Sequence, residues 1–335
     1  MNKERYTTKA IVEVGLISVV MFMIVLMSTY LPILQVLGVC LLPIPIAILY
    51  LRYNLNVAGS GAVISFILTA FLVNPITAIF FGINYAIVGI TLGYCIKQNK
   101  KPYNLFVTIF SVTILVITLT IVFYILLVEK ITIPQFLNDT ISSINSYALS
   151  IIDETKNTYI KMGASEQIIN TIELSKKMVS REYIIAFIPP TLLIQSFVLT
   201  YITIVLNNSI LKKLKIKYVK AMSFADFYVS NLVGAALIGI MSISIILKSR
   251  GIESAIYPMT ISMVLVEFVL TINGIAAISY FLMRKKKLSP IAVTIIIVVT
   301  YPMGLGKFYA LIGIIEMLFD FRKLDPHRIF KGKGA

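Results

Sequence analysis

Apolar stretches of membrane-spanning length recur along the chain and dominate its pattern. Eight of them are long enough to cross about 30 Å of hydrocarbon as single helices. They comprise residues 10–30, 33–51, 57–73, 75–95, 105–128, 183–206, 227–247 and 257–283. Because a helix satisfies its own backbone in lipid, the pattern predicts an all-α, polytopic helical membrane bundle.

A further apolar stretch begins at Ile291 and is interrupted by residues 301–306. Pro302 removes a helical hydrogen bond, and Gly304 and Gly306 weaken the helix further. We therefore expect a broken hairpin of two short helices, at about 291–301 and 305–319. They form either a re-entrant hairpin or two full crossings, and both arrangements return the C-terminus to the side from which the stretch starts.

One long hydrophilic insertion, residues 129–182, separates the fifth and sixth spans. Between Leu137 and Tyr159 its apolar residues recur at three- and four-residue steps, which is typical of an amphipathic helix. Gly163 can end that helix, and Ser165 can begin a second one. The sequence thus predicts an extracytoplasmic amphipathic hairpin. It serves as a lid over a substrate entrance, as a packing element, or as a hairpin lying in the membrane interface.

Composition and charge fit this picture and exclude most soluble classes. The chain is 58% apolar and 13% charged, against about 45–50% and about 25% in soluble domains. The net charge of +15 is concentrated in short loops between spans, such as 97–101, 212–220 and 284–287. Placing these loops inside puts both termini in the cytoplasm. This pattern is an orientation signal, so we expect a lipid bilayer and no nucleic acid as partner.

These boundaries divide the chain into four expected regions. Residues 1–128 form a membrane region of five helices, and 129–182 form the hairpin. Residues 183–320 form a C-terminal membrane region, and 321–335 a basic cytoplasmic tail.

Polar residues inside the predicted spans are the candidates for a binding site, because they are costly in lipid. Glu267 lies near the centre of its span, either as a proton or cation site facing a cavity or as a protonated group bonded to a neighbouring helix. The uncharged candidates for substrate binding are Gln35, Asn84, Gln195 and Asn273. Each of these can equally be an interhelical hydrogen-bonding residue.

Catalytic chemistry has little support in the sequence. With a single histidine, two distant cysteines and no hydrolase, zinc or phosphate-loop motif, we expect no enzyme activity, no metal and no cofactor.

Two acidic residues near span ends have structural explanations. Glu13 can pair with Lys9 one turn away, and Asp226 can cap the helix that follows it.

The C-terminal third contains two short motifs. One is Asn273-Gly274-Ile275-Ala276-Ala277 ahead of a basic run, and the other is Gly313-Ile314-Ile315-Glu316 followed by Phe319-Asp320-Phe321-Arg322-Lys323. In these motifs the chain resembles the YybS-like multi-pass membrane proteins of Gram-positive bacteria. Where the family pattern has glutamine and aspartate, this chain has Asn273 and Glu316. The resemblance implies a protein of the bacterial cell membrane, without implying a particular activity.

The first half is similar in layout to the S components of energy-coupling-factor importers, and Lys9-Ala10 opens the first span as in their N-termini. This similarity implies a small-molecule substrate and an ATP-driven coupling module, or another membrane protein, as partner. Our first hypothesis is therefore a protein that binds a small molecule between its helices and takes part in transport. The alternative is a non-transporting scaffold or regulator that contacts partners through the hairpin or the basic loops.

The end of the last helix offers a second candidate site. Glu316 and Asp320 are four residues apart and share a helix face, with Arg322 and Lys323 just beyond. These four residues are either a helix end with interfacial anchors or a docking site for a partner.

Overall fold

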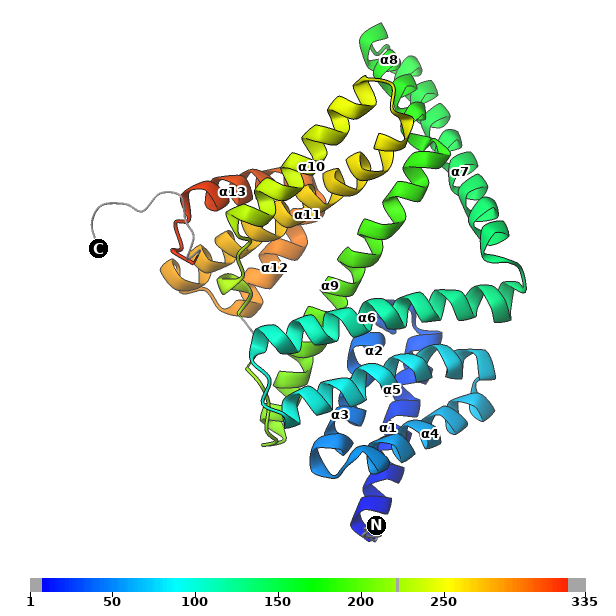
Figure 1. Ribbon diagram of the computed structural model, residues 1–335, viewed down its shortest axis with the longest axis vertical. Helices are drawn as coiled ribbons and strands as arrows, with labels where there is room; N and C mark the ends of the chain where they lie inside the picture. Colours follow the sequence, from blue (N-terminus) through cyan, green and yellow to red (C-terminus); the bar gives the residue numbers. More distant parts are fainter. Residues whose placement is uncertain (1–7, 221–222, 325–335) are drawn as a thin grey trace. The chain divides into compact units, whose positions relative to one another are not determined.

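The computed structural model describes residues 8–220 and 223–324, and within them it is helical with no strand (Figure 1). The first part of the chain forms α1 (Thr8–Tyr30), α2 (Pro32–Leu41), α3 (Pro43–Arg52), α4 (Leu55–Leu72), α5 (Pro75–Lys97) and α6 (Pro102–Tyr124). The second part forms α7 (Ile133–Lys161), α8 (Glu166–Ser175), α9 (Arg181–Lys213), α10 (Asn231–Ser249), α11 (Ile256–Tyr280), α12 (Pro290–Thr300) and α13 (Gly306–Phe319).

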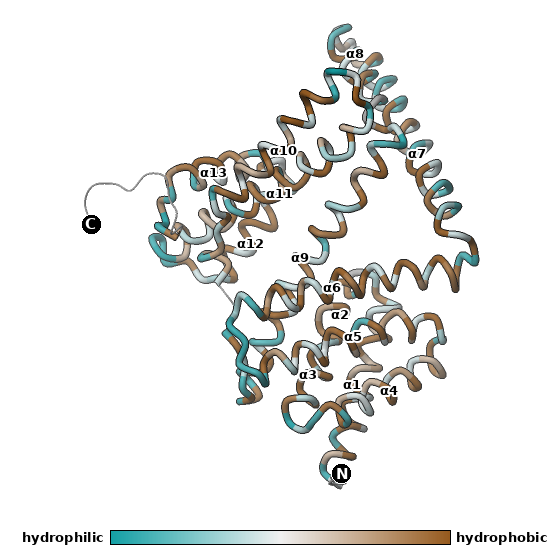
Figure 2. The backbone as a smooth tube through the Cα atoms, in the orientation of Figure 1, coloured by the Kyte–Doolittle hydropathy of each residue, from teal (hydrophilic) through white to brown (hydrophobic). Residues whose placement is uncertain are grey.

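Nine segments of the described chain are long and apolar enough to cross a membrane, which confirms the predicted fold class. Figure 2 shows that apolar residues dominate these segments, whereas α7 and α8 carry many hydrophilic residues. The expected span at 33–51 consists of two helices, α2 and α3. They meet at Leu42 and Pro43, where proline has no backbone N–H to continue the ladder.

The chain forms two compact units. Unit 1 comprises the described residues of Met1–Leu137 and Leu192–Ala221, and unit 2 those of Asn138–Thr191 and Met222–Ala335. Helix α9 contributes to both units, and the division falls just after Pro189 and Pro190.

In unit 1, α5 packs closely on α3 because two of its residues have no side chain. A Cβ atom on Gly89 would lie 2.6 Å from the carbonyl oxygen of Pro43, and one on Gly93 would lie 2.7 Å from Cβ of Tyr50. An apolar core forms around this contact and includes Leu92 of α5, together with residues of α3, α6 and α9. The small residues thus allow the helix packing that positions the rest of the unit.

In unit 2, the closest crossing joins α11 and α13. A Cβ atom on Gly274 would overlap the carbonyl oxygen of Tyr309, and one on Gly313 would overlap that of Leu270. The two backbones therefore touch, which only glycine permits. Gly234 of α10 similarly faces Met317 of α13.

The hydrophilic insertion folds as the predicted helical hairpin. Helix α7 ends before Gly163, which has a φ of +74°, and α8 follows after Ser165. The Nζ atom of Lys156 lies 2.6 Å from the Glu173 carboxylate. Lys176 bridges back to α7 by a contact of 2.8 Å with Asp153. Ion pairs at the surface therefore link the two helices.

The last apolar stretch is broken where the sequence predicts it. Residues Tyr301–Leu305 form a distorted turn in which Gly304 has a φ of +90°. Across this break the hydroxyl groups of Thr300 and Tyr309 lie 2.6 Å apart.

Two local predictions are corrected by the structure. Asp226 is not a helix cap: it lies in a short turn and pairs with Arg284 at 2.8 Å, while α10 begins only at Asn231. Glu13 pairs with Arg52 and accepts a hydrogen bond from the Tyr53 hydroxyl, because α3 brings these groups to its side of α1. A cytoplasmic location is also predicted for the basic residues before residue 8 and after residue 324, and these lie outside the described residues.

Candidate functional site

Unit 1 contains a pocket of about 740 Å³. It lies at the end of the unit where α1 and α6 end and where α2 and α5 begin, with α9 along one side. We call it the unit 1 pocket. Its lining residues are Ser28, Thr29, Pro32, Gln35, Val39, Thr77, Phe80, Phe81, Asn84, Val116, Ile117, Thr120, Ile121, Tyr124, Phe136, Gln195 and Leu199.

Three of the predicted substrate-binding residues meet in this pocket. Gln35 is in the first turn of α2, Asn84 is on α5, and Gln195 is on α9. None of their amide groups forms a hydrogen bond with the described part of the chain, and the Asn84 Oδ1 atom is buried as well as unpaired. An amide that is not used between helices is free to bind a ligand.

Aromatic rings form one wall of the pocket. The ring of Tyr124 lies 6.0 Å from that of Phe80 and 6.3 Å from that of Phe136. The Tyr124 hydroxyl donates to Glu129 at 2.7 Å, so it is already occupied. The lining residues include no charged side chain. The pocket therefore suits an uncharged molecule with an apolar or aromatic body and a few hydrogen-bonding groups.

A buried polar face of α9, whose residues were not identified as candidates from the sequence, adjoins the pocket. It consists of Ser196, Thr200, Thr203 and Asn207, each at most 5% exposed. Thr200 forms a hydrogen bond of 3.2 Å with Thr113 of α6. Both polar atoms of the Asn207 amide are buried without a partner among the described residues. The spacing of three and four residues was the available signal, because it places all four on one helix face.

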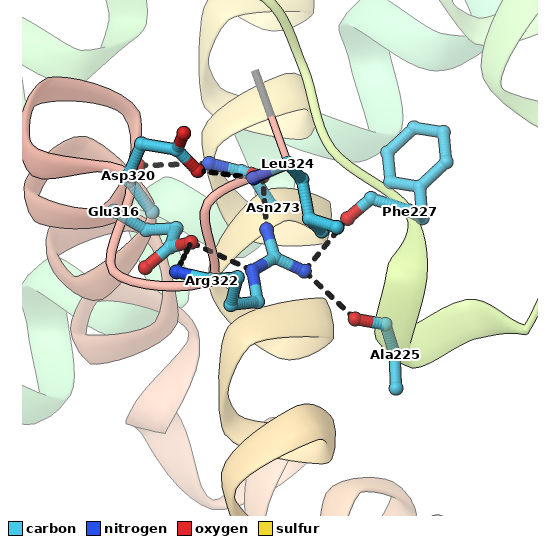
Figure 3. Close-up of polar contacts among 8 residues, drawn as sticks. Ala225, Phe227, Asn273, Glu316, Asp320, Arg322 and Leu324 are labelled. Atoms are coloured by element: carbon cyan, nitrogen blue, oxygen red, sulfur yellow. Dashed lines mark hydrogen bonds and ion pairs between the residues drawn. The ribbon is translucent and has the colours of Figure 1, made fainter. Parts of the chain in front are cut away.

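Unit 2 contains a second polar site, centred on a buried guanidinium group (Figure 3). Arg322 donates from Nε to Glu316 at 2.7 Å and from Nη2 to the Asn273 side-chain oxygen at 2.9 Å. Its Nη1 atom donates to the carbonyl oxygens of Ala225 and Phe227, at 3.0 and 2.8 Å. We call these groups the Arg322 cluster. A buried charge needs such partners, because unpaired it would be strongly destabilising.

Comparison with protein families shows the family to which the chain belongs. A family model described as a predicted membrane protein (DUF2232) matches residues 19–317. The chain belongs to this family. The matched residues include the pocket amides, Asn273 and Glu316, and the family description agrees with the multi-pass membrane fold. The comparisons with curated proteins and with solved structures find no match.

In this DUF2232 family member, Asn273 does not join the other predicted substrate-binding residues. Its side chain is 1% exposed, and its Nδ2 atom donates to the Gly313 carbonyl at 3.1 Å while its oxygen accepts from Arg322. Both the nitrogen and the oxygen of this amide thus form hydrogen bonds with other segments of unit 2. Asn273 has the interhelical hydrogen-bonding arrangement that was the alternative for every amide in the spans.

The residues predicted to contact a partner or the membrane edge differ in exposure. Glu316, Asp320 and Arg322 are each at most 7% exposed, and the Asp320 side chain accepts from the Leu324 N–H at 2.8 Å. Lys323 is exposed. In this conformation the first three side chains are therefore engaged inside unit 2.

Glu267 lies in neither polar site. Its side chain is exposed on α11, and it forms no hydrogen bond or ion pair with the described residues. The structure thus shows neither the cavity-facing arrangement nor the bond to a neighbouring helix.

Proposed function

We propose that this membrane protein binds an uncharged small molecule in the unit 1 pocket and takes part in its transport. The observation that carries the proposal is the meeting of three unpaired amides, those of Gln35, Asn84 and Gln195, in one pocket. Its volume of about 740 Å³ falls in the range of about 300–1,000 Å³ that is common for small-molecule sites.

The buried Asn84 amide oxygen favours a ligand on energetic grounds. A buried polar atom without a partner costs about 1–3 kcal/mol. A ligand with a donor for Asn84 Oδ1 recovers that free energy on binding, and the exposed amides of Gln35 and Gln195 offer it further hydrogen-bonding groups. Apolar contact with Phe80, Phe81 and Phe136 supplies the remaining affinity.

The charge distribution favours entry from outside. The pocket lies at the start of α5, whereas Lys97 is the last residue of that helix and Lys100 follows it. The positive-inside rule assigns the lysine end to the cytoplasm, so the pocket belongs to the outer half of the membrane. This placement suits capture of an extracellular compound.

The energy source for transport is proposed to lie in another chain. The sequence has no phosphate-loop motif, and the similarity in layout to S components favours an ATP-driven module or another membrane protein as partner. Ala10 is 3% exposed and packed inside unit 1. A docking surface for such a partner is therefore expected elsewhere than at Ala10.

A scaffold or regulator is the second candidate function, and the hairpin favours it. Ile144, Tyr147 and Ile151 of α7 are 45%, 70% and 45% exposed, although they lie at the spacing of one helix face. An exposed apolar face of this kind suits contact with a partner protein.

Mass spectrometry of the protein purified gently from its own membranes distinguishes the two functions. A retained small molecule, with or without a co-purifying ATPase, is expected for transport. The retained molecule should be lost in Asn84→Leu and Gln195→Leu and kept in Asn104→Leu, because Asn104 is exposed at the far end of α6. Partner proteins without any small molecule contradict the transport proposal and favour the scaffold.

A further inference from the structure

Unit 2 has a cavity of about 420 Å³ beside the Arg322 cluster, at the C-terminal end of α11. We call it the Lys285 groove. It lies between the last turns of α11, the π-helical turn Phe281–Lys285, α13 and the residues after α13. Its lining residues are Ala277, Ile278, Tyr280, Phe281, Leu282, Lys285, Ile312, Glu316, Phe321 and Arg322.

The groove combines apolar walls with one unneutralised positive charge. Ala277, Ile278 and Ile312 supply aliphatic surface. Glu316 and Arg322 pair with each other and cancel in charge. Lys285 forms no ion pair with the described residues, and its Nζ atom lies 5.4 Å from the centre of the Phe281 ring. The groove therefore has a net charge of +1 from these three ionisable side chains.

The surroundings of the groove strengthen its positive potential. Arg284, Lys286 and Lys287 flank Lys285, and Asp226 neutralises only Arg284. This basic run begins in the π-helical turn that continues the apolar α11, which is where a membrane helix is expected to leave the hydrocarbon. The Arg284 guanidinium lies 4.9 Å from the centre of the Tyr280 ring. Tyrosine is enriched at the boundary between membrane and water.

We propose that the Lys285 groove binds an anionic phospholipid of the leaflet that faces the basic loops. The headgroup phosphate pairs with Lys285, and an acyl chain lies against Ala277, Ile278 and Ile312. Basic pockets between membrane helices have this composition because they must satisfy a charged headgroup and an apolar tail together. The apolar walls favour a lipid over a free phosphate ion, which would gain nothing from them. This proposal does not depend on the function of the unit 1 pocket.

Native mass spectrometry of the full chain, released from detergent micelles and titrated with phosphatidylglycerol or phosphatidylcholine, tests this site. Wild type should retain phosphatidylglycerol in preference to phosphatidylcholine. Lys285→Gln should weaken the retention of phosphatidylglycerol about five-fold, the effect of one lysine near an anionic membrane surface. Lys287→Gln, which changes the same charge outside the groove, should have a smaller effect.

A second variant separates the groove from general attraction to the basic run. Ala277→Trp keeps every charge and fills the apolar part of the groove, so it should also reduce lipid retention. Equal losses in the two lysine variants, with no loss in Ala277→Trp, would overturn the proposal in favour of general surface attraction. Competition by inorganic phosphate at millimolar concentration would instead indicate a site for the free ion.

Discussion

The unit 1 pocket and the Arg322 cluster are built from similar polar side chains, but they differ in how those side chains are paired. In the cluster, Asn273 uses both ends of its amide, and the Arg322 guanidinium donates to four oxygen atoms. In the pocket, the amides of Asn84 and Gln195 have no partner in the described chain. The cluster therefore has the pairing of a structural site, whereas the unpaired amides of the pocket are the groups that the proposed ligand would bind.

The difference in pairing also implies different effects of mutation at the two sites. Removing a paired buried group leaves its partners unsatisfied and is costly. Removing an unpaired one relieves a desolvation penalty and costs little. The comparison thus predicts that mutations in the cluster act on folding, whereas mutations in the pocket act on ligand binding.

The largest effect is expected at the backbone contact that underlies the cluster. Gly313→Ala places a methyl group on the Leu270 carbonyl oxygen, so α11 and α13 must separate. We expect a loss of more than about 3 kcal/mol in unfolding free energy. Gly239→Ala is the matched control, because nothing lies within 4 Å of a Cβ atom there. Amide hydrogen exchange should accelerate along α11 and α13 only in the first variant, and equal behaviour of the two would refute the contact.

The next effect concerns the charge of the cluster itself. Arg322→Met leaves Glu316 buried without its cation, and we expect a loss of about 3–5 kcal/mol. Adding Glu316→Gln should recover part of that loss, because the remaining group is then neutral. Denaturant titration followed by circular dichroism measures both variants. A double variant less stable than Arg322→Met would show that the ion pair is not the source of the effect.

A gain in unfolding free energy, opposite to the two losses above, is expected from a substitution on α9 of unit 1. Asn207→Leu replaces an amide without a described partner by an apolar group of similar size, so it should stabilise the protein by about 1–3 kcal/mol. The reaction of a thiol probe with Cys40 and Cys95, both buried in unit 1, reports its unfolding. A lower stability than wild type would instead indicate a bound group that pairs with Asn207.

The smallest effect concerns the exposed ion pairs of the hairpin. Hydrogen bonds from Lys156 and then Lys176 lower the pKa of the Glu173 carboxyl from its usual 4.5. A lowered pKa in the folded state means that this stabilisation is present above pH 4.5 and is lost as the pH falls through the folded value. Amide exchange of α8 should therefore increase modestly in acid. Glu173→Gln should show that increase already at pH 7, and unchanged exchange in this variant would exclude the ion pairs as its cause.

Sequence patterns predicted the helices better than the pairing of their polar groups. The spans and the hairpin follow from the local pattern of apolar residues, and the break near Gly304 follows from local proline and glycine residues. Neighbouring residues alone are enough to predict these elements. The pairing of Asn273 does not, because its partner Arg322 lies 49 residues further along the chain. For the same reason Asn273 and Asn84 looked alike in the sequence. The partner of Glu13 was missed because Arg52 is distant in sequence, whereas Lys9 is one turn away.

The most direct test of the central comparison is the unfolding free energy of Asn84→Leu beside that of Asn273→Leu. Both variants remove one amide from a predicted membrane span, and both replace it with the same apolar group. The pairing predicts little change or a gain for Asn84→Leu and a loss of at least about 2 kcal/mol for Asn273→Leu. The latter leaves the buried Arg322 Nη2 group without its side-chain acceptor and removes the hydrogen bond from α11 to the Gly313 carbonyl of α13. Equal losses in the two variants would contradict the distinction between a ligand pocket in unit 1 and a structural cluster in unit 2.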